Sequence, residues 1–276
     1  MTIFDMHLHF SGIASFYDGA RAAGVDYSGA GLKKECDENG IAKIIAMGAE
    51  ETKDYAFTDN EAALPMGCDL PGAPGFMRVC LGINPHRINS ESLLVLESEL
   101  KKNAAGIKIY PGYFYFTPDD PVYDPIYALA EKYNKPVVIH TGGTYSEKGI
   151  LDYSRPTHAD RAAVKYRNVN FVLAHLSVPW VMESCQYAYK NKNVYVDLSG
   201  LIVGGKDEIE RVASERLLMD LYMQGLVYMN KYDRVLYGSD WPLVPMKPYI
   251  EFCKKVIPEK HHAKVFYKNA AGLFGE

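Results

Sequence analysis

The sequence predicts an α/β protein with the (β/α)8 (TIM) barrel fold, and three observations indicate this. The chain has 276 residues, which suits one large α/β domain. Eight short apolar runs recur along it, and segments with a helical pattern separate them. No G-x-G-x-x-G motif follows the first run, so the commonest reason to expect a doubly wound open sheet is missing. We therefore expect a single barrel domain over residues 1–276.

The apolar runs are the expected strands. Most are rich in Val, Ile and Leu with little polar alternation, which is typical of parallel strands that helices cover. In chain order they are TIFDMHLHF (2–10), IAKIIAMGA (41–49), MRVCLGIN (77–84), GIKIYP (106–111), PVVIHTG (136–142), VNFVLAHLS (169–177), NVYVDLSG (193–200) and RVLYGSDWP (234–242).

The segments between the runs are the expected helices. In residues 90–106, Leu93, Leu96 and Leu100 fall on one helical face. Similar patterns cover residues 122–134, 158–168, 179–191 and 261–276. A longer charged segment, 206–230, reads as one long helix whose ordinary role is to cover the barrel. It could also supply a contact in a homodimer through Leu217, Leu218, Leu221, Tyr222 and Met223.

Charge and composition exclude several classes of function. The net charge of −4 gives no electrostatic reason to expect a nucleic acid or an anionic membrane as partner. No apolar run approaches the ~18 residues of a membrane span, and the N-terminus lacks the basic region of a signal peptide. The five cysteines are scattered and form no C-x-x-C pair, as in a protein that keeps its thiols reduced. We expect a cytoplasmic protein with a small-molecule substrate.

The first run, MTIFDMHLHF, carries imidazoles at positions 7 and 9. Because successive side chains of a strand point to opposite faces, we expect His7 and His9 to share a face with Ile3 and Asp5. The other face then takes the apolar residues Phe4, Met6, Leu8 and Phe10. Buried histidines are often only hydrogen-bonded members of a core, so the pair alone leaves two interpretations open, a metal site and a packed core.

Polar residues at the ends of other runs favour the metal site. Lys108 ends the fourth run, His140 the fifth, His175 the sixth and Asp240 the eighth. In a barrel the C-terminal ends of the strands converge on one face, where such enzymes hold their chemistry. Imidazoles and a carboxylate suit one divalent metal, Zn²⁺ first, with Mn²⁺, Fe²⁺ or Co²⁺ as alternatives. Asp240 could then take a proton from metal-activated water, and His175 could polarise or protonate the substrate.

At these residues the sequence resembles the amidohydrolase superfamily, in the amidohydrolase-related branch that includes amino-carboxymuconate-semialdehyde decarboxylase. The resemblance spans nearly the whole chain and rests on DMHLHF, GIKIYP, VVIHTG, VLAHLS and YGSDWP. It implies a (β/α)8 barrel whose metal ligands are His7, His9, His140 and Asp240. His175 matches a sixth-strand histidine that assists catalysis in one-metal members and binds the second ion in two-metal members.

Lys108 leaves two interpretations open. Superfamily members with two metals often bridge them with a carboxylated lysine on the fourth strand, and GIKIYP places Lys108 on the same face as Tyr110. The alternative is an unmodified lysine that pairs with an acid or contacts a substrate anion. One-metal sites are usual in this branch, so the resemblance favours the second interpretation and a second metal remains the alternative.

Four further residues are candidates for substrate contacts. Tyr110 opens an aromatic loop, YPGYFYFTPDDPVYDPIY (110–127), which would favour a small organic substrate. His86 follows the third strand at the same end of the barrel, and Trp241 follows Asp240 directly. Arg155 lies in a loop from which its guanidinium could bind a carboxylate.

These residues support two reactions. The first is hydrolysis of an amide, lactone or ester bond of a small molecule through metal-activated water. The alternative is metal-dependent decarboxylation or hydration of an unsaturated or aromatic carboxylic acid. A nuclease is disfavoured because the chain is acidic and lacks a basic stripe. A barrel that binds a metabolite without turnover would keep the same ligands, so the residues alone do not exclude it.

Overall fold

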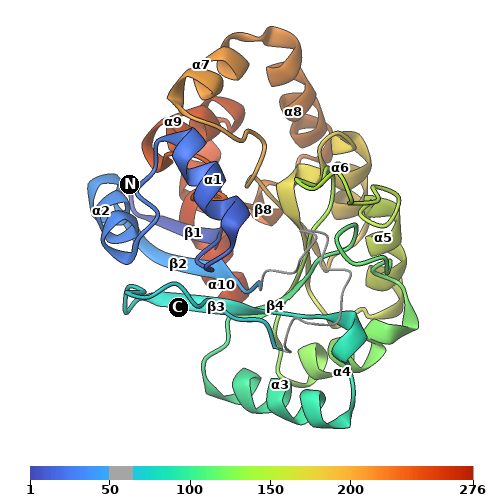
Figure 1. Ribbon diagram of the computed structural model, residues 1–276. Coiled ribbons are helices and arrows are strands. Elements are labelled where there is room, and N and C mark those ends of the chain that lie inside the picture. The colour runs from blue at the N-terminus through green and yellow to red at the C-terminus, as the bar shows by residue number, and fades with distance from the viewer. Residues whose placement is uncertain (50–64, 276) are drawn as a thin grey trace.

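The protein forms the expected barrel. The computed structural model describes residues 1–49 and 65–275, in which eight parallel strands pair in chain order (Figure 1). The strands are β1 (Ile3–Leu8), β2 (Ile41–Met47), β3 (Met77–Gly82), β4 (Gly106–Ile109), β5 (Val137–Ile139), β6 (Phe171–Leu173), β7 (Val194–Asp197) and β8 (Val235–Leu236). Each expected strand is therefore present, and the prediction of a (β/α)8 fold is confirmed.

Helices surround the strands, as Figure 1 shows. They are α1 (Ala14–Ala23), α2 (Gly29–Asn39), α3 (Ser90–Lys102), α4 (Asp124–Lys132), α5 (Pro156–Lys165), α6 (Val181–Lys190), α7 (Lys206–Ser214), α8 (Arg216–Met229), α9 (Met246–Val256) and α10 (Asn269–Phe274). The segment 206–230 differs from the expected single helix, because Glu215 has an extended ψ of 99° and separates α7 from α8. No helix in the described ranges is long and apolar enough to span a bilayer.

The barrel closes where β8 meets β1. The backbone N–H of Met6 donates to Tyr237 O at 3.1 Å, and that of Asp240 donates to His7 O at 2.8 Å. A third bond runs from His9 N to Trp241 O at 2.7 Å. The first strand and the segment that follows the last strand are thereby held side by side.

Two layers of apolar side chains form the core. The inner layer fills the barrel with residues from alternate strand positions, and α10 packs against it. Its members include Phe4, Met6, Ile45, Met47, Val138, Val172, Leu236 and Phe274. The outer layer lies between the strands and the surrounding helices and includes Ile44, Ile107, Ile139, Leu173 and Val196.

One expectation for the first strand is wrong. The pairing of β1 with β2 shifts between Asp5 and Leu8. Asp5 pairs with Ile44 and Leu8 with Ala46, so β1 has one residue more than β2 between these two pairs. This extra residue is a β-bulge, which reverses the alternation of side chains. Phe4 and Met6 therefore join the inner layer, whereas Ile3 and Leu8 belong to the outer layer. Ile3 and Asp5 do not share a face with His7 and His9.

Candidate metal centre

Three buried side chains from the joined ends of β1 and β8 meet at one point. Nε2 of His9 lies 3.2 Å from Oδ1 of Asp240, and Nε2 of His7 lies 3.6 Å from the same oxygen. One ligand atom from each residue lies within 4.8 Å of the others. Among residues 1–49 and 65–275, no other group of three or more His, Cys, Asp or Glu side chains comes as close together.

The local backbone brings these residues together. Asp240 adopts a left-handed conformation with φ of 65°, which turns its side chain at the end of β8. Oδ1 of Asp5, on the outer side of β1, accepts hydrogen bonds from the backbone N–H of His7 at 3.2 Å and of Ser239 at 3.0 Å. A single buried carboxyl group thus connects the two segments that carry the candidate ligands.

Burial and mutual contact determine the charges of Asp240 and His7. Burial alone would raise the pKa of Asp240, but the imidazoles of His175, His9 and His7 lower that pKa well below its usual range. Burial and the nearby Lys108 lower the pKa of His7 to about 3. The ionised carboxylate of Asp240 and the neutral imidazole of His7 are donors of the kind that bind divalent metals.

His140 and His175 form a second pair beside this group. Nδ1 of His140 lies 3.1 Å from Nε2 of His175. The other nitrogen of each ring lies 3.1 Å from a carbonyl oxygen, Gly143 O for His140 and Ser199 O for His175. Because a carbonyl only accepts, those nitrogens carry the hydrogens, and the two lone pairs of the neutral rings face one another. A cation near both nitrogens would relieve this opposition.

Two residues that are not among the predicted site residues complete the cluster, one at the end of β7 and one in the loop after it. Oδ2 of Asp197 lies 2.8 Å from Nδ1 of His7, and Oγ of Ser199 lies 3.0 Å from Nδ1 of both His7 and His175. A signal was present, because the seventh apolar run also ends in an acid, in VDLSG, at the same end of the barrel.

Lys108 lies inside the barrel at the floor of the site. Its Nζ is 3.4 Å from Nε2 of His7 and 5.1 Å from the ring centre of Tyr110. The side chain is fully buried, and burial lowers its pKa to about 8. Lys108 and Tyr110 thus share the inward face, as the spacing of GIKIYP predicts.

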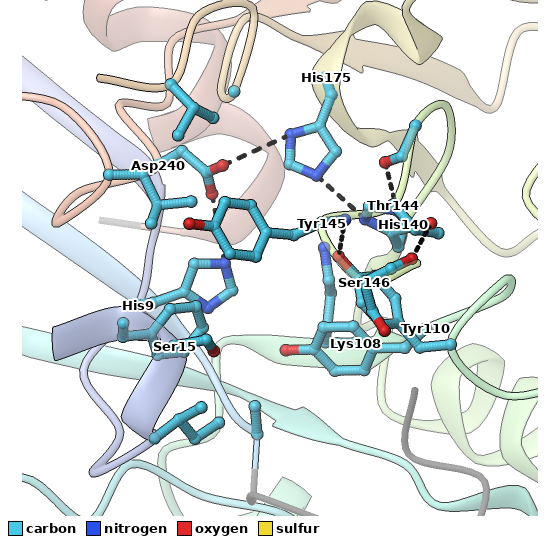
Figure 2. A pocket seen from close by; sticks show the side chains of 18 of the residues that line it. His9, Ser15, Lys108, Tyr110, His140, Thr144, Tyr145, Ser146, His175 and Asp240 are labelled. Carbon is cyan, nitrogen blue, oxygen red and sulfur yellow. Dashed lines mark hydrogen bonds and ion pairs between the residues drawn. The ribbon is translucent and has the colours of Figure 1, made fainter. Parts of the chain in front are cut away.

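A cavity of about 260 Å³ opens above these residues. Figure 2 shows His9, Asp240, His175, His140 and Lys108 directed toward it from different strands. Its remaining wall is mainly apolar and aromatic, with a few hydroxyl groups; it includes Ile13, Phe16, Tyr110, Tyr113, Thr144, Tyr145, Ser146, Val178, Val203 and Leu243. The ring of Phe16 stacks on His9 with the centroids 4.4 Å apart. Lys108 is the one Lys or Arg among the described lining residues.

Three predicted substrate contacts lie elsewhere. Arg155 is on the surface, where its guanidinium pairs with Glu183 at 2.8 Å. His86 is exposed beside Phe116, with the ring centroids 5.1 Å apart. Trp241 is fully buried, and its ring packs against that of Tyr27 with the centroids 5.1 Å apart. None of the three is among the described residues that line the cavity.

The residues at the floor fit a divalent metal. Oδ1 of Asp240 and Nδ1 of His9 are buried without a hydrogen bond of good geometry, although buried polar atoms are nearly always partnered. The Asp240 oxygen is the atom that faces Nε2 of both His7 and His9. A cation between the Asp240 oxygen and the two Nε2 atoms would be coordinated by all three, and the imidazoles of His140 and His175 also line the cavity.

Comparison with known proteins identifies the family. The model of the Amidohydrolase family matches residues 4–275, nearly the whole chain. The chain belongs to the amidohydrolase family. It is a metal-dependent enzyme, as this family and its barrel-shaped structural neighbours indicate. The resemblance noted in the sequence is thereby confirmed.

Solved structures share the fold of this amidohydrolase at low sequence identity. A 2,6-dihydroxybenzoate decarboxylase in complex with 2,6-dihydroxybenzoate superposes with a TM-score of 0.68 at 13% identity and covers 100% of both chains. A dihydroxybenzoic acid decarboxylase from Polaromonas sp. JS666, with bound manganese and the inhibitor 2-nitroresorcinol, gives a TM-score of 0.66 at 15% identity over 99% and 96% of the two chains.

One curated relative is similar over a short region. Protein fluG of Emericella nidulans is 34% identical over 85 residues, which is 30% of this chain. The match spans only 10% of the length of that relative. It therefore supports local similarity and no statement about the activity of the whole relative.

Proposed function

We propose that this amidohydrolase decarboxylates a small aromatic or unsaturated carboxylic acid, with one divalent metal held by His7, His9 and Asp240 and with His140 as the next ligand. One observation carries the proposal. The cavity floor combines the metal donors with a buried lysine, whereas the wall above them is apolar and aromatic. Such a pocket suits a flat organic molecule with its anionic group directed to the floor.

The charges at the floor fit a carboxylate. The metal, when bound, supplies positive charge and coordinates oxygen atoms of the substrate. Lys108 is the proposed second contact for the anion, since its Nζ is directed into the cavity from below (Figure 2). The ring of the acid would then lie among Phe16, Tyr113 and Tyr145. The structural neighbours named as decarboxylases of hydroxybenzoic acids support this substrate class.

Decarboxylation needs one proton transfer. The bond between the ring carbon and the carboxyl carbon breaks, carbon dioxide leaves, and the electron pair stays on the ring carbon, which takes a proton. We assign that transfer to His175, whose ring lines the cavity, with Asp240 as the neighbouring base at 3.9 Å. Burial lowers the pKa of His175 and favours the neutral ring in the free protein, and we propose that the ring takes up the proton from solvent once the acid is bound.

Hydrolysis of a lactone, amide or ester is the second candidate, because the ionised carboxylate of Asp240 lines the cavity and can accept a proton from water there. The two reactions are separated by their products. Decarboxylation releases one carbon dioxide for each acid consumed, whereas hydrolysis releases none and forms a new carboxyl group together with an alcohol or an amine.

The test uses untagged protein refilled with Zn²⁺ or Mn²⁺. It is incubated with 2,6-dihydroxybenzoate and related hydroxybenzoates, and separately with lactones, esters and amides of similar size. We expect carbon dioxide in amounts equal to the acid consumed, and none with Asp240→Ala. Lactone hydrolysis without carbon dioxide would establish the second candidate, and no turnover of any acid would contradict the first.

Metal analysis by elemental mass spectrometry tests the site itself. We expect about one equivalent per chain, with Zn²⁺ suited to the imidazole and carboxylate donors and Mn²⁺ as the alternative. Asp240→Ala should lose it. About two equivalents would instead favour the bridging role of a carboxylated Lys108, and none after refilling would remove the metal from the proposal.

A further inference from the structure

Asp197, the last residue of β7, accepts hydrogen bonds from both histidine-bearing segments of the site. Its Oδ2 lies 2.8 Å from Nδ1 of His7, on β1. Its Oδ1 accepts from the backbone N–H of His175 at 3.0 Å and from that of Ser199 at 2.9 Å. The side chain is fully buried. Since these backbone groups can only donate, they favour the carboxylate form of Asp197.

A carboxylate at this place determines which nitrogen of His7 carries the hydrogen. A carboxylate only accepts, so Nδ1 of His7 must be the donor in the 2.8 Å contact. In the neutral ring the lone pair is then on Nε2, which is the nitrogen that faces Asp240. Asp197 therefore presents His7 to the site in the tautomer that can ligate a metal through Nε2.

Ser199 extends the same control to His175. Its Oγ–H donates to Oδ1 of Asp197 at 2.5 Å, so its lone pairs are left to accept. The Oγ atom lies 3.0 Å from Nδ1 of His7 and 3.0 Å from Nδ1 of His175. The carbonyl oxygen of Ser199 lies 3.1 Å from the same nitrogen of His175. Both acceptors place the hydrogen of His175 on Nδ1 and the lone pair on Nε2, toward His140.

We propose that Asp197 and Ser199 are positioning residues that fix His7 and His175 in the Nδ1–H tautomer. The end of β7 and the loop after it thereby orient a metal ligand from β1 and the proton-transfer residue that follows β6. The functional consequence rests on the proposed metal site. The tautomers themselves do not depend on which reaction the enzyme catalyses.

The first measurement is the tautomer of each histidine in the metal-free wild-type protein. Long-range ¹H–¹⁵N spectra of histidine-labelled protein distinguish Nδ1–H from Nε2–H rings, and His7→Gln and His175→Gln assign the two signals by their loss. We expect both rings as Nδ1–H. An Nε2–H ring at either position would overturn the proposal without any further variant.

The second measurement is metal affinity, by competition with a chromogenic chelator. In Asp197→Asn the amide can present N–H₂ to His7 Nδ1, so the Nδ1–H tautomer loses its acceptor. We expect metal to bind about 10- to 100-fold more weakly, together with an Nε2–H signal for His7. Ser199→Ala keeps the Asp197 contact and should weaken binding by less than about tenfold, because one of two acceptors remains.

The matched control is Asp160→Asn on α5, since that carboxylate bonds only to Lys190 and Asn191 in the described structure. Its metal affinity should equal that of wild type. Unchanged affinity in a folded Asp197→Asn would contradict the positioning role. Because neither readout uses a substrate, failure of the proposed decarboxylation would leave this test intact.

Discussion

Gly200 lies so close to His175 that a Cβ atom on Gly200 would be 2.6 Å from Nδ1 of the imidazole. The same atom would lie 2.7 Å from Oδ2 of Asp240. Gly200 also has a φ of +59°, in the left-handed region that side chains rarely adopt. Glycine is therefore required at position 200 for two reasons: a side chain would collide with His175 and Asp240, and the backbone is left-handed.

Gly200→Ala should therefore impair the site more than the fold. The methyl group must displace His175 or Asp240, so we expect at least a tenfold loss of activity and weaker metal binding. Gly24→Ala is a matched control, because Gly24 has a φ of +71° with nothing within 4 Å of its Cβ position. Both variants should lose about 1 kcal/mol of stability from the left-handed backbone, and only Gly200→Ala should lose activity. Equal activities would contradict the contact.

His175→Ala should separate metal binding from proton transfer. If His175 transfers the proton and His7, His9 and Asp240 hold the metal, the variant keeps about one equivalent of metal and loses roughly 10²- to 10⁴-fold in kcat. The comparison variant is His86→Ala, which removes an exposed imidazole outside the cavity lining. It should retain both the metal and the kcat of wild type. Loss of metal from His175→Ala would assign that histidine to the metal instead.

Lys108→Met should distinguish the two interpretations of the buried lysine. An anion contact predicts a KM for an acidic substrate that rises by roughly tenfold or more, with metal content unchanged. A carboxylated bridge predicts the loss of a second equivalent of metal. Lys135→Met serves as a control, since that half-buried lysine bonds to Ala104 O and does not line the cavity. An unchanged KM together with unchanged metal content would contradict both interpretations.

The convergence of polar residues could be predicted because it follows from topology. Parallel strands of a barrel end on one face, so a polar residue at the end of an apolar run falls near the site whatever its distance in sequence. His7, His9, Lys108, His140, His175 and Asp240 all lie around the cavity floor for this reason.

The remaining errors come from local backbone geometry. The bulge in β1 adds one residue to the strand, so the strict alternation of side chains predicts the wrong face for Asp5. Trp241 follows Asp240 at a turn with positive φ, so its side chain packs into the core although its neighbour enters the site. Arg155 belongs to a loop whose course depends on packing, and a surface partner, Glu183, binds it. None of these features has a sequence pattern of its own.

Asp5 also predicts a specific dependence of stability on pH. Burial raises the pKa of this carboxyl from 3.8 to about 7. Between pH 3.8 and about pH 7, Asp5 of the unfolded chain has released its proton, whereas Asp5 of the folded protein still binds it. Folding is therefore coupled to proton uptake, and the free energy of unfolding contributed by Asp5 falls as the pH rises. The loss is complete only above pH 7 and amounts to about 3 kcal/mol between pH 5 and pH 8.

Asp5→Asn should remove this slope. The amide oxygen can still accept the hydrogen bonds from His7 N and Ser239 N, and the side chain has no proton to release. Urea unfolding of the metal-free proteins at pH 5, 6, 7 and 8 measures the difference between wild type and variant. The variant should gain about 3 kcal/mol relative to wild type across this series, whereas Asp160→Asn should run parallel to wild type. Other buried groups, such as Asp197 and Asp240, titrate alike in wild type and variant and cancel in the difference. A constant difference between wild type and Asp5→Asn would mean that Asp5 is ionised in the folded protein throughout, with its second oxygen bound by a partner such as water.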